Sequence, residues 1–249
     1  MITRKWCVIL LVLIVAPIFV FGGHGDDPFP IKPGSEEWNK LTSNVQRVEM
    51  LQLPKNELEK MPTTQLLQVC LDYPLAPEMM LYDTIQQGTE IIIGQFNGLQ
   101  ELMKRKDAAI ILLKFYSKLS PDLLDRKWTL RRKGEFAFKF RYIELLLSQD
   151  CVLSTLSSSK RRQLLRKAIQ TFESKRENPE VYGLMSLNAP VLVMARVLEK
   201  DNSQALKRQI GENERLNQFL KTAHLIDSDL MDPLVAEAND YLSNYRIGE

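Results

Sequence analysis

The sequence predicts an all-α protein, either an α-α superhelix of the HEAT or armadillo kind or an irregular bundle of roughly nine to ten helices. Apolar residues recur at helical spacing in most segments between breaks. Proline and glycine punctuate the chain at short intervals, as they do at tight helix corners. The one segment with strand-like alternation has no partner strand. Because no internal repeat of fixed period is visible, superhelix and bundle both remain open.

The N-terminus has the order of a secretory signal peptide. Arg4 and Lys5 precede an apolar run over residues 6–21, and glycines follow it. This run is short for a membrane span, which needs about 20 residues. We therefore expect residues 1–22 to be a signal peptide cleaved near Gly22 or Gly25, with an uncleaved membrane anchor as the alternative. The expected location is secreted or periplasmic, in the cell envelope.

Two further regions follow the signal peptide. Residues 23–34 are rich in Gly and Pro, and we interpret them as a flexible lead. Residues 35–249 are expected to form a single helical domain, since this length buries a sizeable core. Cys70 and Cys151 would remain after cleavage. An oxidising compartment permits a disulfide between them, and two buried free thiols are the alternative.

The first half of the domain contains clear helix boundaries. Ser35 is a predicted N-cap, and Thr63 or Thr64 is another after Pro62. Pro74 ends the helix that begins there. Gly88 is interpreted as a left-handed cap that separates two helices. The expected helices cover residues 35–53, 55–60, 63–73, 77–88, 89–106 and 108–119, the last being nearly apolar all round and therefore central.

The second half is less regular. Residues 122–134 fit a short helix followed by a basic loop, whereas residues 135–147 fit both a strand and a helix, and we choose the helix. The serines at 157–159 open an amphipathic helix that runs to residue 176. Gly183 and Pro190 are expected to divide residues 180–200 into a short helix and a longer one. A helix over residues 201–221, interrupted at Gly211, and a last helix from Ser228 or Asp229 complete the domain.

One stretch resembles a known family. The residues that carry the resemblance are Met61, Thr63, Thr64, Leu67, Leu71, Tyr73 and Pro74, followed by Ile85, Gln86, Gly88, Phe96, Asn97, Leu99, Glu101 and Leu102. This M-x-T-T-x-x-L…L-x-Y-P segment and the FN element after it resemble a family of secreted bacterial all-helical proteins with no known activity. The resemblance spans roughly residues 36–118. It implies an exported helical protein and supplies no catalytic residues.

The middle of the chain is strongly basic. Residues 101–176 carry 19 basic and 8 acidic side chains, whereas the regions on either side are acidic. If helix ends align there, a basic patch could attract an anionic envelope polymer or an acidic protein. The alternative is a solvated face offset by the acidic flanks. The candidate binding residues are Lys104, Arg105, Lys106, Arg131, Arg132, Lys133, Arg161 and Arg162.

Several enzyme classes have no support. After cleavage near Gly25 His224 alone remains, so a histidine-dependent nucleophile or a structural zinc site is not expected. No glycine-rich nucleotide-binding motif occurs, and we expect no cofactor, no metal and no nucleic-acid partner. Asp72 and Tyr73 could line a groove, but a helix terminator with Tyr73 packed inward is favoured.

We therefore expect an exported protein that acts as a binding module, with an enzyme as the alternative. A helical scaffold that contacts an anionic or protein partner is the first hypothesis. A carboxylate-dependent glycan hydrolase at the cell surface is the alternative, and it requires two Asp or Glu facing one cleft. A purely structural part of a surface assembly is the third.

Overall fold

The computed structural model describes residues 28, 29, 31–224 and 226–246, so the predicted signal peptide lies outside the described residues. These residues form α-helices and 3-10 helices and no strand, which confirms the all-α prediction. In chain order the elements are α1 (Glu36–Lys40), α2 (Asn44–Met50), α3 (Lys55–Lys60), α4 (Thr63–Leu71), η1 (Ala76–Leu81), α5 (Ile85–Gln95), α6 (Asn97–Lys104), α7 (Ala108–Lys118), η2 (Pro121–Leu123), α8 (Leu130–Leu147), α9 (Asp150–Leu153), α10 (Ser158–Arg176), α11 (Leu184–Lys200), α12 (Gln204–Glu212), α13 (Glu214–Thr222) and α14 (Ser228–Arg246).

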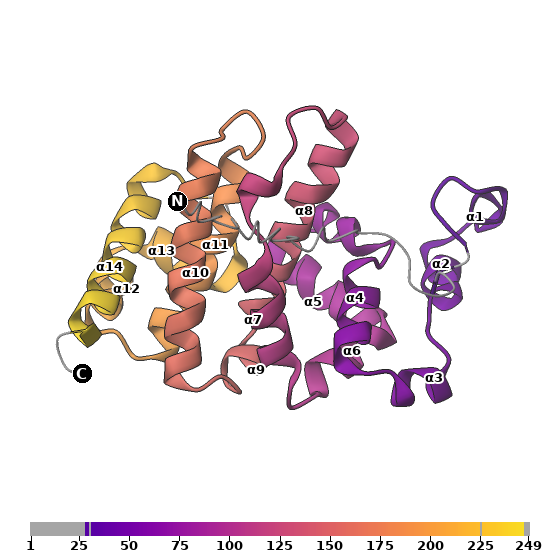
Figure 1. Ribbon diagram of the computed structural model, residues 1–249, viewed down its shortest axis with the longest axis horizontal. Helices are drawn as coiled ribbons and strands as arrows, with labels where there is room; N and C mark the ends of the chain where they lie inside the picture. The colour runs from indigo at the N-terminus through magenta and orange to yellow at the C-terminus, as the bar shows by residue number, and fades with distance from the viewer. Residues whose placement is uncertain (1–27, 30, 225, 247–249) are drawn as a thin grey trace, which may run out of the picture.

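The helices exceed the expected number because several predicted helices are divided. An irregular multi-helix bundle fits the arrangement, in which the elements follow one another from the α1–α3 arm to α12–α14 at the opposite end (Figure 1). A helical repeat remains a prediction. No helix among the described residues is long and apolar enough to span a lipid bilayer.

The N-terminal arm is made of the three short helices α1, α2 and α3. Ser35 caps α1 as predicted, since its hydroxyl accepts a hydrogen bond from the Trp38 backbone N–H at 3.1 Å. Phe29, in the predicted flexible lead, is buried against the rings of Tyr73 and Phe96, with centroids 5.9 and 5.8 Å away. At Phe29, therefore, the lead is packed against the core.

The residues of the family-like segment hold this arm to the bundle. Tyr73 stacks on Phe96 with ring centroids 4.2 Å apart, and both rings are buried. Asn97 accepts a hydrogen bond from the Leu53 N–H at 3.0 Å and donates one to the Leu53 carbonyl at 2.8 Å. The predicted inward packing of Tyr73 is thus confirmed, while Asp72 forms an ion pair with Lys139 at 3.1 Å.

Gly88 has a different role from the one predicted. It lies inside α5, whose N-cap is Thr84, and it does not end a helix. A Cβ atom at this position would stand 2.0 Å from the Met79 carbonyl oxygen, so the glycine allows α5 to touch η1. The single helix predicted after Thr89 is also divided, because Phe96 turns into an extended conformation between α5 and α6.

The centre of the bundle consists of α7, α8, α10 and α11. The helix chosen for residues 135–147 is confirmed as part of α8, whose C-terminal half is buried on every side. Ser157 caps α10 as expected, accepting a hydrogen bond from the Lys160 N–H at 3.3 Å. The two cysteines are free, and Cys151 is exposed while Cys70 is buried, so the expectation of two buried thiols is wrong for Cys151.

The predicted break at Pro190 is wrong, because α11 is continuous from residue 184 to residue 200. A proline has no N–H for the carbonyl four residues earlier, which here belongs to Ser186. The buried ammonium of Lys175 donates to that carbonyl at 3.2 Å. A side chain from α10 thus satisfies the acceptor that the proline leaves free, and the helix passes through it.

The C-terminal helices are close to expectation. The predicted interruption falls at Asn213 and not at Gly211, because the Asn213 side chain caps α13 by accepting from the Arg215 N–H at 3.0 Å. The last helix begins at Ser228, as predicted. It packs along α10 and α11 at the end of the bundle away from the arm (Figure 1).

Candidate functional site

Two groups of the predicted basic residues lie towards opposite ends of α8. Arg131, Arg132 and Lys133 lie in its first turn. Arg161 lies near the other end. It forms an ion pair with Asp201, and the residue before Asp201, Lys200, forms an ion pair with Asp150, three residues after the C-terminal end of α8. The eighteen residues of α8 make a helix about 27 Å long, so these two groups do not form one surface.

Arg105 of the predicted patch uses its guanidinium for contacts within the protein. Its guanidinium forms an ion pair with Glu101 at 2.9 Å. It also donates to the backbone carbonyls of Leu58 and Met61, at 2.9 and 2.5 Å, in the α3–α4 region. These contacts occupy the side chain within the protein, while its neighbours Lys104 and Lys106 remain exposed.

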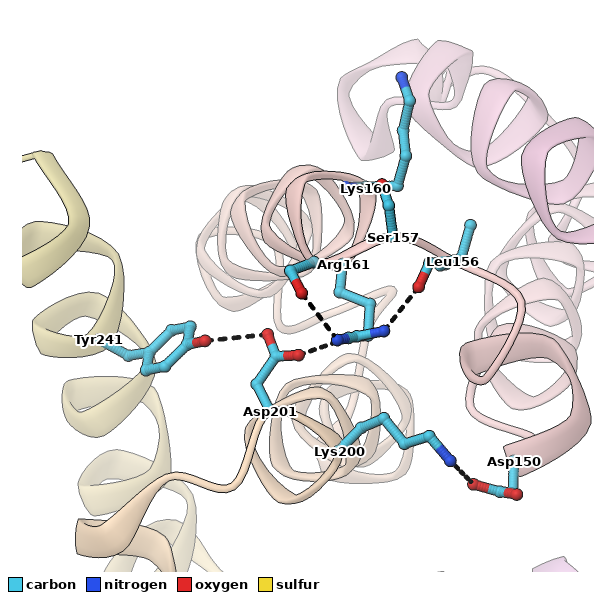
Figure 2. Close-up of polar contacts among 9 residues, drawn as sticks. Asp150, Leu156, Ser157, Lys160, Arg161, Lys200, Asp201 and Tyr241 are labelled. Atoms are coloured by element: carbon cyan, nitrogen blue, oxygen red, sulfur yellow. Dashed lines mark hydrogen bonds and ion pairs between the residues drawn. The ribbon is translucent and has the colours of Figure 1, made fainter. Parts of the chain in front are cut away.

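Arg161 is also held inside the protein (Figure 2). Its guanidinium joins the Asp201 carboxylate on one side and the Leu156 carbonyl on the other. The second oxygen of Asp201 accepts a hydrogen bond from the Tyr241 hydroxyl of α14 at 2.9 Å. The Asp201 side chain is 4% exposed, which makes this a buried junction of α10, α11 and α14.

A cleft of about 770 Å³ opens beside this junction. It lies where α5, the α8–α9 corner, the end of α11 and the end of α13 meet. Its lining is polar apart from two leucines. The lining residues are Gln86, Glu90, Ser148, Gln149, Asp150, Leu153, Arg196, Glu199, Lys200, Asn202, Leu220 and Lys221.

Arg196 forms the floor of the cleft and ties its walls together. It donates to the Ser148 carbonyl at 3.1 Å, to the Leu220 carbonyl at 2.9 Å and to the Gln86 side-chain oxygen at 2.9 Å. Gln86 in turn donates to Glu90 at 2.7 Å and to Gln149 at 3.0 Å. Burial lowers the pKa of the Arg196 guanidinium, which these acceptors stabilise as a cation. The floor is therefore fixed before any ligand arrives.

The cleft lining carries charges of both signs in equal number. Glu90, Asp150 and Glu199 face Arg196, Lys200 and Lys221. Lys200 donates to Asp150 at 2.7 Å, and this hydrogen bond is the main reason that the pKa of the Asp150 carboxyl is lowered. The cleft thus offers donors and acceptors without a net charge.

The described residues give little for acid–base or metal catalysis. A glycosidase acid needs a carboxyl with a raised pKa in the cleft. Burial raises the pKa of Glu144, but that side chain is completely buried in the core. His224 is exposed and outside the cleft lining. No group of three or more His, Cys, Asp or Glu that could hold a metal occurs in the described part of the chain.

The sequence did not point to the cleft. Its lining comes from four segments between residues 86 and 221, and each segment alone resembles an ordinary solvated helix surface. The one feature of the sequence that could have indicated the cleft is Arg196, because it is the single charged residue in the apolar run of residues 189–198. A lone arginine in such a run must find acceptors from other segments.

Comparison with protein-family models, with curated proteins and with solved structures gives no match to this chain. The resemblance of residues 36–118 to a secreted family therefore remains a prediction.

Proposed function

We propose that this protein is an exported helical binding module that takes an extended polar segment of a partner protein in the cleft floored by Arg196. The observation that carries the proposal is the cleft itself. Its volume of about 770 Å³ is that of a ligand site, for which roughly 300–1,000 Å³ is typical. Its floor is preorganised by hydrogen bonds, so binding does not have to order it.

The chemistry of the lining favours a peptide segment over the other expected partners. Three acidic and three basic side chains suit a ligand with both charges, whereas an anionic polymer would prefer a basic surface. The exposed amide of Asn202 adds a polar group that matches peptide groups. Among the described residues no aromatic side chain lines the cleft, so a sugar has no ring there to stack on.

Export is supported by the basic start and the apolar run over residues 6–21 of the sequence. The secreted or periplasmic location is part of the same proposal. The glycan hydrolase remains the alternative. It gains no support from the cleft, where Lys200 holds Asp150 and the pKa of that carboxyl is lowered.

The test is selection of binders from a random-peptide phage library on the immobilised protein. Affinities of selected peptides are then measured by fluorescence anisotropy for two charge reversals in the cleft, Glu199→Lys and Lys221→Glu. We expect each reversal to weaken binding several-fold, since one rim charge contributes about 1 kcal/mol.

Two exposed residues outside the cleft provide matched controls. Glu212→Lys and Lys114→Glu make the same charge changes on α12 and α7, and they should leave affinity within about twofold. Failure to enrich any peptide would reject a peptide-binding function. Peptides that bind the cleft variants as well as the wild type would place the binding site elsewhere.

A further inference from the structure

Most of the exposed large apolar side chains of this protein lie on two connections of the bundle. Leu123 in η2 and Leu130 at the start of α8 are 55% and 87% exposed. Leu184 and Met185, in the first turn of α11, are exposed as well. These four are among the seven large apolar side chains that are exposed in the described part of the chain. Single exposed leucines are ordinary, but a group of apolar side chains in one place marks a contact surface.

Hydrogen bonds join the two connections that carry these side chains. The Tyr182 hydroxyl, two residues before Leu184, donates to the Pro121 carbonyl at 3.4 Å. The Ser174 hydroxyl donates to the Asp122 carboxylate at 2.7 Å. The α7–α8 and α10–α11 connections therefore meet at η2, along one edge of the bundle (Figure 1).

The α7–α8 connection is held in place although its two leucines are exposed. Leu124 and Trp128 pack against the core. The Trp128 ring meets that of Phe136 edge to face, with centroids 5.3 Å apart. The Asp125 carboxylate accepts a hydrogen bond from the Lys127 N–H at 2.8 Å, which fixes the turn between them. The exposed leucines therefore belong to a preformed surface.

The same connection is strongly basic where it enters α8. Residues 126–133 carry five basic side chains and no acidic one, namely Arg126, Lys127, Arg131, Arg132 and Lys133. Arg131 forms an ion pair with Glu135 at 2.9 Å. Arg126 and both lysines have no ion-pair partner among the residues that the structure describes. The Arg132 guanidinium lies 4.3 Å from the centre of the Trp128 ring. The two exposed leucines thus stand among cations.

Acidic side chains beside this segment limit where an anionic surface can touch. Asp122 accepts from the hydroxyls of Ser120 and Ser174 at 3.0 and 2.7 Å. Glu177 and Glu180 are exposed on the α10–α11 connection and make it acidic. The part of this edge that fits an anionic surface is therefore the face formed by residues 123–133.

We propose that the face formed by residues 123–133 attaches this protein to the surface of an anionic phospholipid membrane. The cations meet the lipid phosphates, and Leu123 and Leu130 enter the boundary between headgroups and acyl chains. A fluid bilayer adapts to separate projecting side chains, so no preformed groove is needed. None of these residues lines the cleft floored by Arg196.

Membrane attachment at this face leaves the cleft accessible. Residues 130–133 form the first turn of α8, whereas Ser148 and Gln149, just after its last turn, line the cleft. The eighteen residues between these points span about 27 Å. The proposal does not depend on what the cleft binds.

The first experiment is flotation of the full chain with two kinds of vesicle. One is made of phosphatidylcholine, and the other contains equal parts of phosphatidylcholine and phosphatidylglycerol. We expect about tenfold stronger partitioning onto the anionic vesicles at low salt, and a loss of this preference as the sodium chloride concentration rises. The apolar run over residues 6–21 is common to both measurements, so it does not account for a difference between them.

Two double variants test the apolar and the basic parts of the face separately. Leu123→Ser/Leu130→Ser removes the inserted side chains, and Lys127→Glu/Lys133→Glu reverses two charges that have no ion-pair partner among the described residues. We expect each double variant to lower partitioning onto the anionic vesicles about tenfold.

Matched controls make comparable changes at exposed residues elsewhere. Val45→Ser/Leu81→Ser removes two exposed apolar side chains from α2 and η1. Lys104→Glu/Lys106→Glu reverses two exposed charges near the end of α6. Both should leave partitioning within about twofold of the wild type, because only the face of residues 123–133 touches the membrane.

Hydrogen exchange of the full chain shows where the vesicles touch. Residues 122–133 should exchange more slowly on the anionic vesicles, while α5, beside the cleft, should be unchanged. The proposal is overturned if the wild type partitions equally onto both kinds of vesicle, or if the leucine variant binds as the wild type does. A face that serves an acidic protein instead would show no protection of residues 122–133 by vesicles, and that result overturns the proposal too.

Discussion

Gly88 lies so close to Met79 that a Cβ atom at position 88 would stand 2.0 Å from the Met79 carbonyl oxygen. Backbone and not a flexible side chain occupies that space, so Gly88→Ala must push η1 away from α5. We expect a loss of stability of about 1–3 kcal/mol, as for other overpacked sites. Urea unfolding followed by circular dichroism measures it.

Gly94, six residues further along α5, is the matched control. A Cβ atom there meets nothing within 4 Å. Gly94→Ala should therefore raise stability by about 0.5–1 kcal/mol, because alanine favours the helix. Equal effects of the two substitutions would show that the contact between α5 and η1 does not require a glycine.

The buried pair of Lys175 and Glu144 gives a second prediction. Lys175→Met removes the ion-pair partner that donates to both Glu144 carboxylate oxygens and frees the Ser186 carbonyl, and we expect it to cost about 3–5 kcal/mol. Removing both charges in the double variant Glu144→Gln/Lys175→Met should cost less than the two single changes added together. A double-mutant cycle by urea unfolding tests this. Additive costs would mean that the pair is not coupled.

Asn97 gives a prediction about the N-terminal arm. Asn97→Ala removes both hydrogen bonds that the Asn97 side chain forms with Leu53, at 3.0 and 2.8 Å. The backbone N–H and carbonyl of Leu53 then lose these partners. We expect a loss of about 1–3 kcal/mol and faster hydrogen exchange at residues 52–53. Asn217→Ala, which removes one bond to Glu214, is the control and should change stability by less than about 0.5 kcal/mol. Unchanged exchange in Asn97→Ala would contradict the role of Asn97.

The tyrosines predict how stability changes at alkaline pH. Burial raises the pKa of Tyr73, Tyr116, Tyr142 and Tyr182. In the unfolded chain these phenols lose their protons near their ordinary pKa of about 10, while the folded chain keeps them. The unfolded state then binds fewer protons, so stability falls as pH rises above about 10.

Tyrosinate absorbance and far-UV circular dichroism, recorded together against pH, check this prediction. The tyrosinate signal of the four buried residues should appear in step with the loss of helical signal. Complete ionisation in a chain that keeps its native circular dichroism would contradict it.

Much of the fold was predictable because helix caps are local. Ser35 and Ser157 act within three residues of themselves, and the sequence alone located them. Gly88 and Pro190 were misinterpreted because their roles depend on Met79 and Lys175, which lie elsewhere in the chain. A glycine that ends a helix and one that admits a neighbouring backbone look the same in a sequence.

The site was less predictable than the fold. Arg105 and Arg161 belong to basic runs that resemble a contact surface, yet both are taken up by carbonyls and carboxylates of the protein. Lys175 sits at the end of a basic helix, where a sequence predicts a solvated cation. Its burial follows from the packing of α10 against α11, which no local pattern encodes.

The contact between Lys175 and Ser186 also bears on how this sequence can change over evolution. A lysine in a core and a proline within a helix are each unfavourable alone, but here the lysine ammonium caps the carbonyl that Pro190 leaves free. Each residue removes part of the penalty of the other. Among descendants of this chain, we expect positions 175 and 190 to be inherited as a pair, and a chain that loses one to be under pressure to replace the other.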